Sequence, residues 1–275
     1  MDLDAYLDRI GYRGSLAPTR DALAAIMRAH LKSIPFENLD VQLGQPITGD
    51  LSAIFAKLVG RRRGGWCYEQ NGLLGWALAA LGFEVIPVAG GVMRVASGDA
   101  VLGNHLALIV ALDEPLLVDV GFGGSLAEPI ALAAGAHRHP PYDLTLARAD
   151  DGFWRYEEWS RGRPFSFDFR SEAADPALLA RQQARLQTDP DSPFVLNLVA
   201  QQRTGDRHAA LRGRVLTLTR GDRYEEFLIE DAETLVTTLR ARFGLDVPEI
   251  AARWPAICER HEALFGEAGS GPGGA

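Results

Sequence analysis

Cys67 stands in a setting that favours a reactive thiol. It follows the segment 63–66 (Arg-Gly-Gly-Trp) and opens an apolar pattern of helical spacing that runs to Leu81. Adjacent glycines let the backbone turn sharply, and the first turn of a helix directs free N–H groups and the positive end of its dipole at the sulfur. Both effects favour a thiolate, and the same N–H groups can stabilise an oxyanion. The pattern predicts a cysteine nucleophile for acyl transfer.

Two other interpretations of the cysteines are weaker. A free cysteine is often a packing residue, and this fits Cys258, which falls within a helical pattern. Cys67 has no second Cys or His at a usual ligand spacing, and His137 and His139 form only a pair in a loop, so we expect no metal. Two cysteines are too few for a disulfide framework, which favours a cytoplasmic protein with reduced thiols.

A thiol nucleophile needs a base, and the base needs a group that orients it. Among the six histidines, His105 opens a strongly apolar strand. By contrast, His30 and His261 fall in helical patterns, and His208 lies in a polar loop. From the strand alone, His105 fits a structural hydrogen-bonding role as well as it fits a catalytic one.

Asp119 favours the catalytic interpretation of His105. It follows an apolar run, where an unpaired carboxylate costs several kcal/mol, so it needs a partner. If the loop between the two strands is 112–114, Ala111 pairs with Pro115. Asp119 then lies diagonal to His105 on the same face, roughly 7–8 Å away between backbones. A two-residue loop would place the two side chains on opposite faces, so the catalytic interpretation predicts an odd-length loop.

The order of the patterns indicates an α+β fold. Helical spacing fills the first third of the chain, β-like runs fill the middle, and the last part mixes both, which is not the alternation of a doubly wound sheet. We expect helices at 19–34, 50–59, 67–81, 174–186, 231–243 and 249–265, and strands at 83–95, 104–111, 115–120, 142–148, 153–159, 164–169, 213–220 and 223–229. The Gly-rich tail 269–275 is expected to be disordered.

Length and charge weigh against some partners. The 275 residues suggest one large domain or two to three small ones. A net charge of -8 argues against nucleic acid or an anionic membrane surface, because both favour an excess of Lys and Arg. No run of about 18 uncharged apolar residues appears, and the first residues show no apolar targeting segment, so we expect no membrane span.

Three segments resemble the arylamine N-acetyltransferase family. They are 35–39 (Pro-Phe-Glu-Asn-Leu), 63–71 around the cysteine, and 119–123 (Asp-Val-Gly-Phe-Gly). His105 falls where the histidine of the family is expected, and the order Cys, His, Asp also matches. The Arg-Gly-Gly-x-Cys-x-Glu-x-Asn pattern is highly specific. The resemblance spans most of the chain and weakens after about residue 130.

The resemblance implies a three-part fold with a cysteine-protease-like core. Residues 1–83 would form a helical bundle with the nucleophile, residues 84–185 a β-barrel with the His and Asp, and residues 186–275 an α/β lid. The implied reaction is ping-pong: acetyl-CoA, the co-substrate, acetylates the cysteine, CoA leaves, and an arylamine, arylhydrazine or N-hydroxyarylamine takes the acetyl group. The implied protein is a cytoplasmic enzyme of xenobiotic metabolism, a monomer or a homodimer.

The resemblance also implies residue roles. Cys67 would carry the acetyl group, His105 would take the thiol proton, and Asp119 would orient and stabilise the imidazolium. Arg63 and Glu37 would form an ion pair that fixes the cysteine loop, a structural role.

Aromatic and glycine residues are expected around this centre. Phe36, Phe122 and Phe194 are expected to line the acceptor pocket because flat apolar rings suit an arylamine, although each also fits a core position. Gly123 and Gly124 are expected to let the backbone approach the pantetheine or the phosphates of CoA, or else to form only a turn.

Two rival functions stay open. One is a related amide-forming enzyme that acts on a carrier-bound polyketide, which would need a docking surface for the carrier protein. The other is a cysteine hydrolase of peptides or amides, which differs only in the nucleophile that reaches the thioester. A binding module is less well supported, because it leaves the buried Asp119 and the Cys67 loop unexplained.

Overall fold

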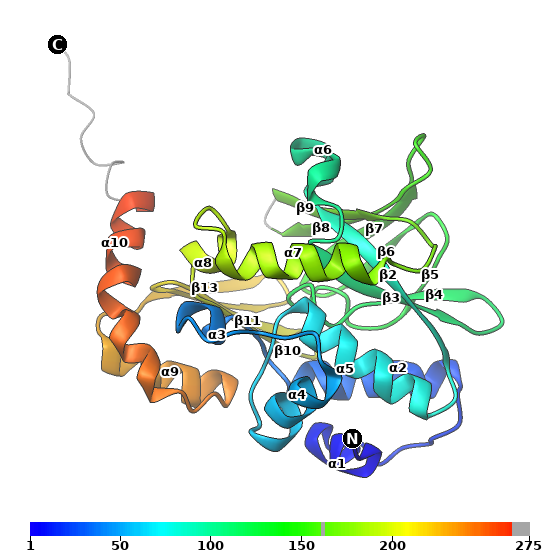
Figure 1. Cartoon of the computed structure of the whole chain (residues 1–275), viewed down its shortest axis with the longest axis horizontal. Coiled ribbons are helices and arrows are strands. Elements are labelled where there is room, and N and C mark those ends of the chain that lie inside the picture. The colour runs from blue at the N-terminus through cyan, green and yellow to red at the C-terminus, as the bar shows by residue number, and fades with distance from the viewer. Residues whose placement is uncertain (161–162, 266–275) are drawn as a thin grey trace.

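Three parts follow one another along the chain (Figure 1): helices at the N-terminus, a large curved sheet, and a second sheet flanked by helices. The structure is a computed structural model that describes residues 1–160 and 163–265. The arrangement confirms the α+β prediction. The expected disorder of 269–275 lies outside the described residues.

Polar side chains start the N-terminal helices. Asp2, Thr19 and Asp50 each accept a hydrogen bond from backbone N–H groups of the helix that follows. The long helix α5 confirms the helix predicted at 67–81, and its apolar residues pack against β2 and β3. The N-terminal elements are α1 (Leu3–Ile10), α2 (Arg20–Ser33), α3 (Leu39–Gln42), α4 (Leu51–Phe55), a π-helical turn (Ala56–Gly60) and α5 (Cys67–Ala80). The sequence patterns did not predict α1.

The curved sheet is antiparallel and nearly closed into a barrel. Its strand order is β5-β4-β3-β2-β9-β8-β7-β6, so the two edge strands are neighbours in the sequence. A short helix α6 (Arg94–Ser97) and a 3-10 turn (Asp99–Val101) connect β2 to β3. The strands are β2 (Glu84–Val92), β3 (His105–Ala111), β4 (Pro115–Val118), β5 (Ile130–Ala131), β6 (Gly135–His139), β7 (Tyr142–Arg148), β8 (Trp154–Ser160) and β9 (Arg163–Phe169).

The β3–β4 hairpin has the register that the sequence analysis requires. Ala111 lies opposite Pro115 and Leu108 opposite Val118, so the loop holds the three residues 112–114. The odd-length loop is therefore confirmed. Because the register fixes which side chains share a face, it directs the start of β3 and the end of β4 toward the same side of the sheet.

The second sheet joins distant parts of the chain. Strand β1 comes from the N-terminal part, yet Phe36 lies opposite Gln201 and Glu37 opposite Ala200 on β10. Helix α9 packs on this sheet through a second apolar core. The division at residues 83 and 185 stays a prediction. The elements are β1 (Phe36–Glu37), β10 (Val199–Thr204), β11 (Arg207–Arg212), β12 (Val215–Arg220), β13 (Arg223–Leu228), α7 (Pro176–Thr188), α8 (Pro193–Leu196), α9 (Ala232–Phe243), a 3-10 turn (Pro248–Arg253) and α10 (Trp254–Phe265).

Three histidines lie elsewhere than expected. His137 and His139, expected in a loop, lie in strand β6 opposite Leu144 and Tyr142. The polar loop assigned to His208 is only a tight turn at Gly205, which has φ 61°, so His208 lies within β11 opposite Arg203 and is buried. Cys258 lies half-buried in α10, and its interpretation as a packing residue stays a prediction. Among residues 1–160 and 163–265, no helix is long and apolar enough to cross a membrane.

Candidate active site

The turn before Cys67 is held against strand β1. Gly65 donates its N–H to the Pro35 carbonyl at 3.2 Å, and its own carbonyl accepts from the Glu37 N–H at 3.0 Å. A Cβ at Gly64 would overlap the Pro35 carbonyl, so only glycine allows this close approach. Cys67 follows as the first residue of α5 and is 2% exposed. The local sequence thus places the thiol at a helix N-terminus, as predicted.

The structure brings His105 and Asp119 together beside this thiol. Nε2 of His105 lies 2.6 Å from Oδ2 of Asp119, and both residues are buried. Burial by itself lowers the pKa of His105, but the carboxylate of Asp119 and the hydrogen bond to Cys67 outweigh it and raise that pKa to about 10. Because Asp119 engages Nε2, Nδ1 is the ring nitrogen left to interact with the Cys67 sulfur. His105 is therefore an imidazolium at neutral pH.

Asn71 fixes the carboxylate of Asp119. Its Nδ2 donates to Oδ1 of Asp119 at 2.8 Å, and its Oδ1 accepts from the Val120 N–H at 3.0 Å. The Gly121 N–H also donates to Oδ1 of Asp119, at 2.7 Å. No sequence pattern predicted this role. The available signal was that Asn71 lies four residues after Cys67, on the same face of α5.

Gly121 lets the Asp119 loop contact the start of α5 directly. A Cβ at this position would lie 2.6 Å from the Cα atom of Cys67 and 2.7 Å from Nδ2 of Asn71. Real Cβ atoms do not approach other atoms so closely, so any side chain would push the loop away from the helix. This contact sets the separation between the thiol and the imidazole–carboxylate pair.

The three phenylalanines form two groups around the site. The rings of Phe36 and Phe194 are 6.2 Å apart, and Phe36 shares an apolar cluster with Cys67. The ring of Phe122 lies 5.1 Å from the ring of His105. Phe122 packs against the large apolar core that the N-terminal helices share with the curved sheet. One aromatic group therefore borders the thiol and the other borders the imidazole. That these rings line an acceptor pocket stays a prediction.

Gly123 and Gly124 adopt a conformation that favours glycine. Their φ angles are 84° and 94°. Nε2 of His208 donates to the Gly123 carbonyl and Nη1 of Arg203 donates to the Gly124 carbonyl, each at 2.7 Å. The second sheet thus holds this loop from outside. The expected role of the two glycines in CoA binding stays a prediction.

Arg203 ties the loop after Asp119 to the second sheet, and sequence reasoning missed it. The side chain is 3% exposed, and no acidic side chain of the described residues forms an ion pair with it. A lone arginine in a polar strand gives no signal of this role. Its guanidinium donates to the carbonyl oxygens of Gly124, Ser125, His139, Pro140 and Gly205.

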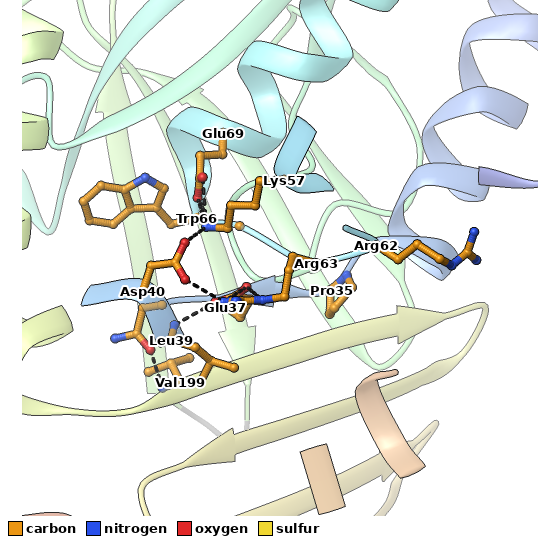
Figure 2. A network of polar contacts seen from close by, with 12 residues as sticks. Pro35, Glu37, Leu39, Asp40, Lys57, Arg62, Arg63, Trp66, Glu69 and Val199 are labelled. Atoms are coloured by element: carbon orange, nitrogen blue, oxygen red, sulfur yellow. Dashed lines mark hydrogen bonds and ion pairs between the residues drawn. The ribbon is translucent and has the colours of Figure 1, made fainter. Parts of the chain in front are cut away.

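The expected ion pair beneath the cysteine loop is present (Figure 2). Nη2 of Arg63 lies 2.9 Å from Oε1 of Glu37, and both side chains are buried.

As for metal binding, the described part of the chain has no group of three or more His, Cys, Asp or Glu side chains placed to hold an ion. His139 accepts instead from the Ala127 N–H at 3.0 Å.

Comparisons with known proteins agree with this geometry. The sequence model of the N-acetyltransferase family matches residues 19–252. The arylamine N-acetyltransferase of Mycolicibacterium smegmatis is 42% identical over 264 residues, which covers 92% of this chain and 95% of that protein. The chain belongs to the arylamine N-acetyltransferase family. It is therefore an acyltransferase, and the resemblance found in the sequence is confirmed.

Solved structures of the family share the fold. The arylamine N-acetyltransferase of M. tuberculosis has a TM-score of 0.83 at 36% identity, covering 93% of this chain and 99% of that chain. The Mycobacterium marinum enzyme, solved in complex with CoA, has a TM-score of 0.84 at 34% identity, covering 96% of this chain and 99% of that chain. The three-part fold implied by the sequence is thus the fold of this acyltransferase.

Proposed function

We propose that this chain transfers the acetyl group of acetyl-CoA to arylamines, arylhydrazines or N-hydroxyarylamines through a thioester on Cys67. One observation carries the proposal: the thiol at a helix N-terminus lies beside a histidine whose Nε2 is 2.6 Å from a buried carboxylate. This arrangement supplies a nucleophile, a base and an orienting group. The M. marinum relative in complex with CoA supports the choice of donor.

In the first half-reaction, Cys67 attacks as a thiolate paired with the His105 imidazolium. Its sulfur forms a bond to the thioester carbonyl carbon, and N–H groups at the start of α5 stabilise the resulting oxyanion. Collapse of this intermediate breaks the carbon–sulfur bond to CoA, and the proton of His105 passes to the departing thiolate. The products are acetyl-Cys67, neutral His105 and free CoA.

In the second half-reaction, the amine nitrogen attacks the acetyl carbonyl of Cys67. Neutral His105 accepts a proton from the nitrogen, and the intermediate collapses with release of the Cys67 thiolate. Asp119 stabilises the imidazolium that forms, so the thiolate–imidazolium pair is restored. The amide product carries the acetyl group, and neither half-reaction needs an oxidant or a metal to balance.

The remaining residue roles are proposals of the same kind. Phe36 and Phe194 would flank the acceptor ring on the thiol side, and Phe122 would flank it on the imidazole side. The backbone at Gly123 and Gly124 would border the pantetheine. The cytoplasmic location, the role in xenobiotic metabolism and the monomer or homodimer state stay predictions.

Mass spectrometry tests the proposal in two steps. Incubation with acetyl-CoA and no amine should add one acetyl group to Cys67 and release CoA, and a simple arylamine should then remove the acetyl group. Cys67→Ser should give no acetylated thiol. Absence of acetylation would contradict the proposal and would favour the enzyme acting on a carrier-bound chain. Rapid loss of the acetyl group to water, whether or not amine is present, would favour a hydrolase.

A further inference from the structure

A continuous chain of charged side chains lies beneath the cysteine loop (Figure 2). Arg63 contacts Glu37 and Asp40 at 2.9 and 2.8 Å. Lys57 contacts Asp40 at 2.8 Å and both oxygens of Glu69 at 2.9 and 3.0 Å. All five residues are at most 8% exposed. The row of charged side chains thus runs from strand β1 through α3 and the π-helical turn to the first turn of α5.

This cluster, defined by Glu37, Asp40, Lys57, Arg63 and Glu69, carries more negative than positive groups. It contains three carboxyl groups and two cations, and burial makes an uncompensated charge costly. Burial raises the pKa of Glu69 to about 7; Lys57 opposes this shift, and Glu37 and Asp40 add to it. The surplus negative charge is therefore lost by proton uptake at Glu69 near neutral pH.

Glu69 also touches the backbone next to the nucleophile. Its Oε2 accepts from the Trp66 N–H at 3.2 Å, and Trp66 immediately precedes Cys67. A Cβ at Gly65 would lie 2.7 Å from the same carboxyl oxygen, so the side chain packs closely against the turn. The carboxyl group thus connects the charged cluster to the peptide that positions Cys67.

We propose that Glu69 is a positioning residue: its carboxylate, held by Lys57, fixes the peptide before Cys67, and a proton taken up by the cluster loosens that peptide. The inference rests on the proposed function of Cys67 as the nucleophile. A charged acceptor makes a hydrogen bond about twice as strong as a neutral one. Because Lys57 neutralises the carboxylate at close range, the positional effect outweighs the repulsion between this carboxylate and the thiolate of Cys67.

Glu69→Gln tests this inference, because glutamine keeps an oxygen for the Trp66 N–H but carries no charge. The rate constant for acetylation of Cys67 is measured in single turnovers between pH 5.5 and 8.5, and the ratio of wild type to variant cancels their shared pH dependence. The ratio should rise from about 1 to about 10, with a midpoint near pH 7, as expected for loss of one charge-assisted hydrogen bond. Glu114→Gln, in an exposed ion pair with Arg20, is the matched control and should give a ratio of 1 throughout.

Asp40→Asn provides an independent variant, which carries the test if Glu69→Gln does not fold. It removes a like-charged neighbour of Glu69 without touching Trp66, and of the two carboxylates that contact Lys57 directly it leaves only Glu69. Both changes favour the ionised form of Glu69. The pH at which the acetylation rate constant of Asp40→Asn reaches half of its maximum should therefore lie below the corresponding pH of the wild type. A midpoint that stays in place would overturn the link between the cluster and the nucleophile.

The outcomes separate this inference from the proposed function. A wild-type to Glu69→Gln ratio that is constant with pH would show a purely structural role and would overturn the inference. If wild-type Cys67 takes no acetyl group, the proposed function fails instead. Alkylation of Cys67 by iodoacetamide at the same pH values then decides the inference, because it also depends on the position and charge of the thiol.

Discussion

Nδ2 of Asn71 lies 2.8 Å from Oδ1 of Asp119, which ties the orienting carboxylate to the helix that carries the proposed nucleophile. Asn71 lies on α5 and Asp119 directly follows β4, so this bond spans the N-terminal helices and the curved sheet. Cys67 and Asn71 occupy the same face of α5. Movement of the helix therefore moves the thiol and the carboxylate together.

Asn71→Ala should lower kcat while leaving the KM for acetyl-CoA nearly unchanged. The substitution leaves one oxygen of Asp119 and the N–H of Val120 without this partner in a buried site, which costs about 1–3 kcal/mol each. We expect kcat to fall about 10- to 100-fold through misplacement of Asp119. Steady-state kinetics and thermal unfolding check this. Asn71→Asp should be worse, because it places a like charge beside Asp119, and equal kinetics in the two variants would contradict the role.

Asp119→Asn should lower the pKa of His105 and with it the acetylation rate. The carboxylate helps to raise that pKa to about 10, and an amide supplies no such charge. The loss in rate should be roughly 10³- to 10⁴-fold, as for an orienting acid of a catalytic triad. NMR titration of the His105 ring measures the shift directly. A ring that still titrates near 10 in the variant would show that Asp119 is not its main partner.

The ion pair of His105 and Asp119 also predicts how the free energy of unfolding depends on pH. The pKa of His105 rises from 6.5 to about 10 on folding, so folding favours the protonated ring. This contribution is fully present below pH 6.5 and is lost as the pH rises toward 10. Asp119→Asn should weaken the pH dependence of the free energy of unfolding in that window, measured by denaturant titration. A variant that keeps the wild-type slope would contradict the assignment.

The site was predictable where local patterns decide it. The glycine pair and the helix start set the position of Cys67, and the three-residue loop set the common face of His105 and Asp119. Family resemblance then placed the fold, which periodicity alone did not specify. The ion pair of Arg63 and Glu37 was also expected, because both lie in segments that match the family pattern.

The supporting contacts were not predictable, because they join segments far apart in the sequence. Arg203 bonds to carbonyls 63 to 79 residues away, and His208 bonds to Gly123 across 85 residues. A carbonyl acceptor leaves no trace in residue type, so no motif marks such a bond. The misplacement of His208 in a loop has the same origin, since only strand pairing shows that the turn before it is tight.

Gly121→Ala should disrupt the site, whereas Gly72→Ala should not. At position 121 the new Cβ would lie 2.6 Å from the Cα atom of Cys67, so the loop or the helix must shift, at a cost of about 1–3 kcal/mol. At position 72, which lies on α5 itself, the nearest atom is 3.6 Å away on Leu51, and alanine favours a helix by about 0.5–1 kcal/mol. Thermal unfolding and acetylation rates compare the two, and similar losses in both would refute the direct contact.

Glu158→Gln should stabilise the protein increasingly as the pH rises. Glu158 is buried on β8, and its Oε2 has no hydrogen-bond partner among the described residues. Burial raises its pKa from 4.5 to about 8, so folding favours the protonated form, and its contribution to stability is lost between those pH values. Glutamine carries no such charge. The free energies of unfolding of variant and wild type should therefore keep a constant difference below pH 4.5 and diverge in favour of the variant from there to pH 8. A difference that stays constant up to pH 8 would show that this carboxyl group ionises at no cost, for instance by pairing with the nearby cation of Arg203.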